Sequence, residues 1–395
     1  MKLTLKLKEF RFVPAAMIAS FGIYNAISFS AIEMMTLSYM SLAVMLAMFL
    51  VSCYLLADEP SLTIFDFAVL TMVMLILIVS LISDTDFKDW IYQGCSILLL
   101  VFLLRYYRDN LSPLLIGAVV AFSLAVYAGF FQLLRHPEMW IVEEAKLTRG
   151  YLLGNNYNQM GCRLIAAVIT NILCLRISRW FWVNLIPLLA SSFGILVIVH
   201  STTSLSCLLL LVFICLFPSL RLQRWGTSAL MVGILLFEVF VCFQGNGLQD
   251  NEFARWLVVD VMDKDLTFTN RTYMWDSAIK CFSSSPVWGY GFVDADWFVA
   301  NMSSRAVGPH NMILAVMIYG GILSIAIYFY TMWTAFRRVW SVEGRVANCV
   351  YAAIVVLSLT MLMEYFPLPF YFYMLALAYY YPEFHRQTSE ENVEA

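Results

Sequence analysis

The sequence predicts an all-α polytopic membrane protein with about 12 transmembrane helices and a large extracytoplasmic loop that contains short interfacial helices. Of its 395 residues, 62% are hydrophobic and only 13% are charged, whereas soluble domains have about 45–50% apolar and about 25% charged residues. Uncharged stretches such as 37–57 and 111–134 are about as long as a helix must be to cross the hydrocarbon core. Strands of a membrane barrel would be shorter and would alternate polar with apolar residues, which these stretches do not.

The spans are placed as apolar runs between charged residues. The start of the chain is basic and then apolar, as in a signal sequence, but no small-residue cleavage site follows, so we expect it to remain as the first span. The two prolines of "MEYFPLPFYFY" allow a broken or re-entrant segment near the end of the chain as an alternative to full spans. The approximate limits are 12–30, 35–56, 64–82, 90–107, 111–134, 157–176, 181–199, 203–218, 225–243, 309–336, 346–363 and 366–381.

Basic residues fix the expected orientation of these spans. The short hairpins "RYYRDN", "RISRW" and "RLQRW" all fall on the side of the N-terminus. Because short cytoplasmic loops carry an excess of Lys and Arg, both termini are expected to be cytoplasmic. The long loops 135–156 and 244–308 then face outward from a single integral membrane domain, 1–395, and loops of this size are usually functional. The net charge of −3 is too small to suggest nucleic acid as a partner.

Within the larger loop, "TNRTYMWDSAIKCFSSSPVWGYGF" predicts a short helix and its end. Thr269 or Asn270 can cap its N-terminus, and Ser283 to Pro286 end it before a tight turn at the glycines of "GYGF". Such a helix would lie on the membrane surface with its aromatic side chains down. One apolar face at helical spacing is formed by Met274, Trp275, Ala278, Ile279 and Phe282.

Arg271 falls in the first turn of this helix, where free backbone N–H groups also point. An anion placed there would meet a guanidinium fork and a helix terminus together. The alternative is an interfacial arginine that contacts lipid headgroups. For Trp275, Trp288 and Trp297, membership of an aromatic belt at the membrane interface is the favoured alternative to a role in a site.

His310 follows Pro309 and precedes an apolar run with a Gly320–Gly321 pair. Since proline suits the first turn of a helix, His310 is expected at the outer end of the next span. An imidazole there can reach water and substrate and can accept a proton near neutral pH. A solvated interfacial histidine is the alternative.

Two further ionisable residues fall inside predicted spans. Arg163 would cost at least about 2.5 kcal/mol at the centre of a membrane helix, so it is expected to face a cavity or a partner, or else to snorkel to the outer interface. The amides of "NNYN", which include Asn156 and Asn158, precede it at the same outer depth. Glu238 lies deep in its span and could pair with a basic residue.

"NRTYMWDSAIKCFSSSPVWGYGF" followed by "PHNMILAVMIYGGILSIAIYF" resembles the hallmark region of the O-antigen ligase and polymerase superfamily. In that family an outer-loop segment R-x-x-x-W…P-x-x-G-x-G precedes a span that opens with His-Asn and carries a later glycine, and "LLGNNYNQMG" resembles a stretch that often begins a middle span. The residues that carry the first resemblance are Arg271, Trp275, Pro286, Gly289, Gly291, His310, Asn311 and Gly320.

The resemblance implies a metal-independent membrane glycosyltransferase without a cofactor or nucleotide sugar. It would act on an undecaprenyl-diphosphate-linked oligosaccharide at the outer face of the bacterial inner (cytoplasmic) membrane, with inversion at the anomeric carbon. Its expected partners are that substrate, an acceptor glycan, the lipid bilayer and, as an optional partner, a chain-length regulator. Arg271 would stabilise the diphosphate and His310 would activate the acceptor. The candidate substrate-binding residues are Arg163, Asn156, Asn158, Trp275, Asn311 and Arg305.

One departure affects the cations of the site. Relatives often carry a basic residue in a Thr-Gly-Ser-Arg-Gly-like turn, where this chain has Thr203 or Ser204 in "VHSTTSLSCLL". Either Arg163 or another outer arginine supplies that charge, or the diphosphate is held with fewer cations.

Four activities remain compatible with the sequence. We favour a polysaccharide polymerase of O-antigen or capsular type, with a ligase that transfers the glycan to lipid A-core as the alternative. Protein oligosaccharyltransferases tend to have a longer C-terminal region. A flippase for lipid-linked sugars would show charged residues near the bilayer midplane and internal repeats. This sequence has no visible internal repeat, and its polar residues cluster at one face.

Overall fold

The structure is a computed structural model of the chain. It describes residues 12–30, 34–58, 61–85, 87–136, 140–143, 146–149, 151–154, 159–245, 251–261, 271–302, 308–362 and 368–394.

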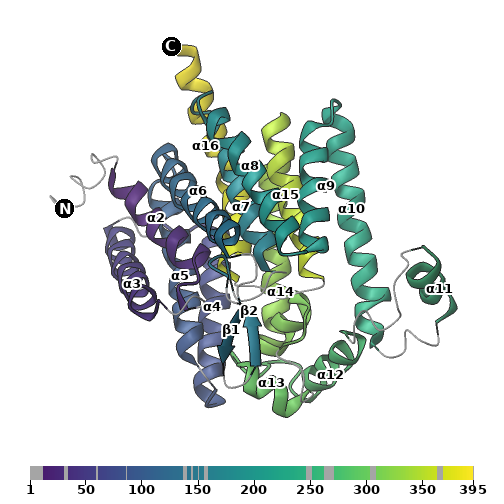
Figure 1. Cartoon of the computed structure of the whole chain (residues 1–395). Coiled ribbons are helices and arrows are strands. Elements are labelled where there is room, and N and C mark those ends of the chain that lie inside the picture. Colours follow the sequence, from purple (N-terminus) through teal and green to yellow (C-terminus); the bar gives the residue numbers. More distant parts are fainter. Residues whose placement is uncertain are drawn as a thin grey trace.

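Each predicted span coincides with a helix (Figure 1). These helices are α2 (Phe12–Ala26), α3 (Met35–Asp58), α4 (Ile64–Ile82), α5 (Phe87–Tyr106), α6 (Ser112–Arg135), α7 (Met160–Cys174), α8 (Phe181–Ile198), α9 (Thr202–Leu216), α10 (Leu220–Phe240), α14 (Met312–Trp340), α15 (Arg345–Met361) and α16 (Leu368–Glu394). Six of them, α3, α4, α6, α8, α10 and α14, are long and apolar enough to cross a membrane. A helical, polytopic membrane protein is therefore confirmed, whereas the number of twelve spans stays a prediction.

The predicted outer loops contain their own short elements. The first holds β1 (Trp140–Glu143) and β2 (Lys146–Arg149), an antiparallel hairpin that pairs Trp140 with Arg149 and Glu143 with Lys146 and that we did not expect. The second holds α11 (Glu252–Arg255), the π-helical turn η4 (Trp256–Val261), α12 (Arg271–Ser284) and α13 (Ala295–Asn301). In Figure 1 the hairpin, α12 and α13 gather at one end of the bundle, opposite the C-terminal end of α16.

The arginines predicted to be cytoplasmic gather at the opposite end, where they bind the ends of neighbouring helices. Arg176 donates to the Thr388 and Ser389 hydroxyls of α16. Arg224 donates to the carbonyls of Trp340 and Val342 at the end of α14. Because helix ends leave carbonyl groups without intrahelical partners, Arg224 satisfies two such groups. Arg176 ties the end of α7 to α16 through hydroxyl groups.

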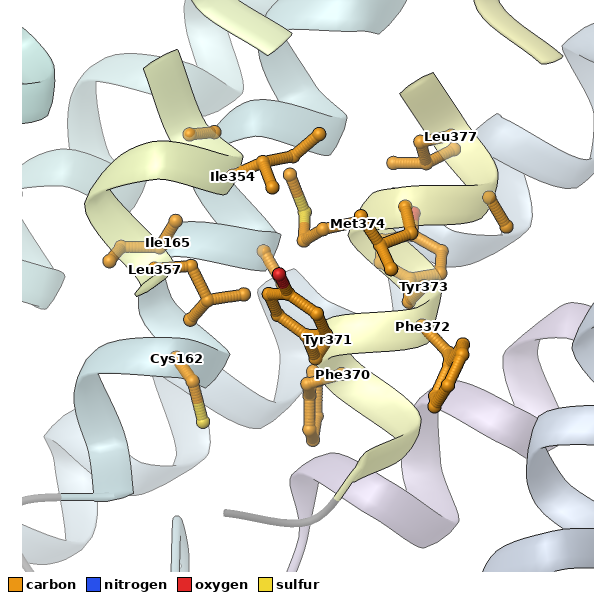
Figure 2. Close-up of a cluster of buried hydrophobic side chains, with 14 of the residues drawn as sticks. Cys162, Ile165, Ile354, Leu357, Phe370, Tyr371, Phe372, Tyr373, Met374 and Leu377 are labelled. Carbon is orange, nitrogen blue, oxygen red and sulfur yellow. The ribbon is translucent and has the colours of Figure 1, made fainter. Parts of the chain in front are cut away.

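The tightest packing lies around α7, α15 and the first turns of α16. Figure 2 shows Tyr371 and Tyr373 of α16 in one cluster with Ile165 of α7 and Ile354 of α15. All four side chains are buried, and the Tyr373 hydroxyl is 2.8 Å from the Thr170 hydroxyl of α7. In contrast, α3 buries few of its side chains, so it lies at the edge of the bundle. The first turn of α16 is therefore buried in the centre of the bundle, with candidate site residues on either side of it.

Candidate functional site

The predicted span 309–336 is not one continuous helix. α14 breaks at Gly320 (φ −142°, ψ 19°) and Gly321 (φ 62°, ψ −156°). Met312 and Ile313 line the same cleft as Tyr328 and Phe329, although 16 residues of straight helix would separate positions 312 and 328 by about 24 Å. The first segment of α14 therefore folds back against the second, a break that the predicted limits 309–336 did not include.

Residues of the predicted outer loop form hydrogen bonds with the backbone groups that the break in α14 leaves without helical partners. The N–H groups of Tyr290 and Gly291 donate to the carbonyls of Ile318 (2.8 Å) and Tyr319 (2.9 Å), and the N–H of Ile322 donates to the Pro286 carbonyl (2.8 Å). In a bilayer each unsatisfied backbone group costs several kcal/mol, so a break in a membrane helix needs such partners. We call residues 286–292 the loop clamp.

The glycines of the loop clamp are required by close approach. A Cβ on Gly289 (φ +69°) would lie 2.4 Å from the Ile318 carbonyl oxygen, and one on Gly291 (φ +78°) would lie 2.4 Å from the Ser80 Cα of α4. The Phe292 N–H also donates to the Ser80 hydroxyl at 2.6 Å. The P-x-x-G-x-G motif therefore builds the junction of loop, α4 and α14, which gives these glycines a structural purpose.

Gly321→Ala should lower the stability of the protein strongly. Gly321 has backbone angles that are essentially restricted to glycine, which costs another residue about 1–3 kcal/mol, and its Cβ would lie 2.2 Å from the Val287 carbonyl oxygen. The thermal midpoint of the detergent-purified protein should fall. Gly233→Ala in α10 is the matched control, because nothing lies within 4 Å of its Cβ, and it should leave the midpoint unchanged or raise it. Equal midpoints for both variants would contradict the role of the break.

His310 lies just before the first segment of α14, near the ends of α10 and α15. The sequence suggested that Pro309 lies in the first turn of the helix. In the structure the helix begins at Met312 with Asn311 as its N-cap, so Pro309 precedes the helix. His310 is half-buried and has φ +46°, a left-handed conformation that is uncommon for a non-glycine residue. Such conformations persist only where the surroundings enforce them.

Asn311 is fully buried and its amide is shared among three groups. Its Oδ1 accepts from the Leu314 N–H at 3.0 Å, which is the helix cap. Its Nδ2 donates to Glu238 Oε2 at 2.9 Å and to the Leu362 carbonyl at 3.4 Å. The buried Glu238 of α10 is therefore paired with an asparagine, not with a basic residue as the sequence suggested.

An apolar cleft opens beside this pair. It is bounded by α10, by both segments of α14 and by α15 and α16, and its walls are hydrophobic apart from Glu238, Ser358 and two tyrosines. The lining side chains include Met231, Ile234, Glu238, Met312, Tyr328 and Tyr371.

Arg271 is the first residue of α12, which confirms the predicted helix and its end near Ser284. Its guanidinium is half-buried and makes no hydrogen bond or ion pair in the described part of the chain. The neighbouring Thr272 is fully buried, and its hydroxyl has no hydrogen-bond partner among the described residues. A helix N-terminus, a cation and an unused hydroxyl therefore adjoin one another.

The apolar face of α12 packs on the protein and not on the membrane surface. Trp275 and Ala278 are both fully buried, so neither the predicted interfacial placement nor the aromatic belt holds for Trp275. Gly245, in the segment just after α10, lies so close to α12 that a Cβ added to it would be 2.9 Å from the Asp276 Cβ. Glu238 near the end of α10 is thus bonded to the start of α14, and Gly245 in the segment just after α10 packs against α12.

Arg163 belongs to a different group of residues. It is 7% exposed, its Nε donates to the Asn25 carbonyl at 3.2 Å, and its guanidinium lies 5.6 Å from the centre of the Phe370 ring. Its Nη1 is buried without a hydrogen-bond partner among the described residues. Phe370 faces Arg163, whereas the adjacent Tyr371 lines the apolar cleft, so the first turn of α16 separates Arg163 from the Glu238–Asn311 pair.

Of the two positions proposed for the missing arginine, Thr203 is exposed, whereas packing excludes a long side chain at Ser204. Ser204 of α9 is buried against α7, where a Cβ on Gly161 would lie 2.6 Å from the Ser204 hydroxyl oxygen. A long side chain at position 204 would separate α7 from α9. Gly161 and Arg163 are two residues apart, so they point to opposite sides of α7. Arg163 consequently does not occupy the space that a side chain at position 204 would enter.

Asn156, Asn158 and Arg305 lie outside the described residues. Sequence reasoning missed the partner of Glu238, because an amide 73 positions away gives no local signal. The "HN" dipeptide at the start of a span could have indicated that Asn311 caps the helix, since asparagine is a preferred N-cap.

One part of the chain, which contains α12, the loop clamp and the start of α14, is similar to a known protein family. No curated protein matches the chain. Residues 187–329, however, match a protein-family model described as O-antigen ligase. This segment runs from α8 to the middle of α14 and includes Arg271, the loop clamp and the His310–Asn311 pair. The match agrees with the resemblance found in the sequence and supports a relationship of this segment to the O-antigen ligase and polymerase superfamily.

Proposed function

We propose that this protein is a polysaccharide polymerase of O-antigen or capsular type. It would transfer a glycan, with inversion, from undecaprenyl diphosphate to a sugar hydroxyl of another lipid-linked repeat unit. The match of residues 187–329 to the O-antigen ligase model supports a membrane glycosyltransferase in general. The proposed location is the bacterial inner membrane, with both termini cytoplasmic and the site on the outer face.

One observation carries the proposal beyond the family. The helix that begins with Arg271 lies against Gly245, just after α10, and the helix that begins after His310 is bonded to Glu238 near the end of α10. Both contacts lie within the segment that matches the family model. Arg271 and His310 thus lie on neighbouring elements at one end of the bundle. In the described part of the protein, the Arg271 guanidinium has no counterion.

The proposed reaction forms one bond and breaks one. His310 accepts the proton of the acceptor hydroxyl, and that oxygen attacks the anomeric carbon of the donor from the face opposite the diphosphate. The bond between this carbon and the diphosphate oxygen breaks, and undecaprenyl diphosphate leaves with the electron pair. Arg271 and the N-terminal N–H groups of α12 would stabilise the developing negative charge.

The remaining candidates would serve the lipid part of the donor. We propose that the first isoprene units lie in the apolar cleft beside Glu238, where Met231, Ile234 and Met312 supply hydrophobic walls. Arg163, whose Nη1 has no partner among the described residues, is proposed as a second cation for the donor, reached from the other side of α16. Trp275 is omitted because its ring is covered by protein.

A ligase is the second candidate, because the matching family model is described as O-antigen ligase. Deleting the gene and separating the surface glycans on a gel distinguishes the two activities. A polymerase mutant should show core decorated with a single repeat unit. A ligase mutant should show bare core together with accumulated lipid-linked polymer. Unchanged long chains in the deletion strain would contradict both.

A further inference from the structure

The carboxylate of Glu238 is placed to control His310 through a single intermediate residue. Glu238 is 2% exposed and Asn311 is not exposed at all. The 2.9 Å bond from Asn311 Nδ2 to Glu238 Oε2 links α10 to the start of α14. No mechanistic step described above uses Glu238.

The bond leaves the Asn311 side chain with no freedom to rotate. While Nδ2 is held by Glu238, Oδ1 must point toward the Leu314 N–H that it caps. A rotated amide would set an N–H₂ group against that N–H donor and an oxygen against the carboxylate, and both contacts are unfavourable. Glu238 therefore specifies the orientation of the amide, and the amide specifies where the helix starts.

The start of the helix in turn fixes His310. Asn311 is extended (φ −159°, ψ 130°) and His310 is left-handed (φ +46°). Released from its cap, the chain would relax toward ordinary angles, because a left-handed non-glycine residue is strained. The imidazole would then move with the backbone.

We infer that Glu238 is a positioning residue that holds the His310 imidazole in place through Asn311. This inference rests on the proposed function for its catalytic meaning, although the positioning itself does not depend on it. In the proposed reaction Glu238 is given no contact with the donor diphosphate or the acceptor hydroxyl, and its carboxylate accepts a hydrogen bond from Asn311.

A reversal of the hydrogen bond tests the inference. Asn311→Asp alone sets two carboxylates against each other. Glu238→Gln together with Asn311→Asp restores a bond in which the introduced glutamine amide donates and the introduced aspartate carboxylate accepts, and that carboxylate can still cap the Leu314 N–H. Glu238→Ala removes the acceptor altogether. Asn348→Ala is the matched control, because it deletes a buried amide that binds Gln223 at the other end of α10.

Two measurements on purified full-length enzyme separate this inference from the proposed function. The first is modification of His310 by diethyl pyrocarbonate, followed by mass spectrometry, with His136, His200 and His385 as internal references. The second is release of undecaprenyl diphosphate from the host's lipid-linked oligosaccharide, extracted from cells that lack the enzyme.

In Asn311→Asp and Glu238→Ala, the modification rate of His310 should change selectively. Turnover should fall by about 100-fold with KM little altered, since a misplacement of about 1 Å costs that much. The double variant should recover both readouts, and Asn348→Ala should alter neither, even if it lowers the thermal midpoint. An unchanged His310 modification rate in both single variants, or no recovery in the double variant, would overturn the inference. Normal His310 modification patterns in an enzyme that releases no undecaprenyl diphosphate would instead refute the proposed function alone.

Discussion

His310→Asn should abolish long-chain glycan while the protein remains in the membrane at its normal level. His310 has φ +46°, and asparagine tolerates this left-handed conformation better than alanine does, so the substitution removes the imidazole and keeps the backbone. Loss of a general base lowers the rate by about 100- to 10,000-fold. The readout is the glycan ladder on a gel, together with immunoblotting of the membrane fraction.

His310→Ala provides the comparison for the backbone. If the imidazole supplies the chemistry, both variants should lack the ladder, and His310→Ala should also have the lower thermal midpoint. A normal ladder from His310→Asn would show that the backbone conformation at position 310 matters and that its imidazole is dispensable. That result would remove the proposed catalytic base.

Arg271→Ala should be the second most severe variant. Its guanidinium has no protein counterion in the described structure, so its removal should cost little stability, whereas loss of a group that stabilises developing charge lowers turnover by about 100- to 1,000-fold. The rate of undecaprenyl diphosphate release from purified enzyme measures this effect. Arg271→Lys should recover only part of the rate, because an ammonium cannot bind a phosphate through two parallel N–H groups.

Lys280→Ala is the control on the same helix. Lys280 is exposed and already pairs with Asp276 at 2.6 Å, so it is not available as a free cation, and its loss should leave the rate unchanged. Arg163→Gln tests the second cation in the same assay. A rate for Arg271→Ala equal to that of Lys280→Ala would mean that Arg271 contacts only lipid headgroups.

Hydropathy predicted the helices well because each long apolar run must satisfy its own backbone in lipid. The helix at α12 and the turn at Gly289 and Gly291 were also predictable, since caps, apolar periodicity and glycine are local signals. The fold-back of α14 was not predictable. Gly320 and Gly321 sit in an apolar run that reads as one span, and the partners that stabilise the break come from a loop about 30 residues earlier.

The candidate site was predictable by residue type but not by arrangement. Sequence alone marked Arg163, Arg271 and His310 as costly or unusual at their positions, yet it could not say that the first turn of α16 separates Arg163 from the other two elements. The burial of Trp275 was missed for a related reason. An amphipathic helix has the same pattern whether its apolar face meets lipid or protein.

The backbone bonds from Tyr290, Gly291 and Pro286 to the broken α14 restrict how substrates can arrive. Lifting this segment like a lid would strip several main-chain groups of their partners at membrane depth, at a cost of several kcal/mol for each. The segment must therefore behave as a rigid wall throughout turnover. In the proposed polymerase, lipid-linked donors would then enter sideways from the bilayer, and the product would leave through an opening away from this segment.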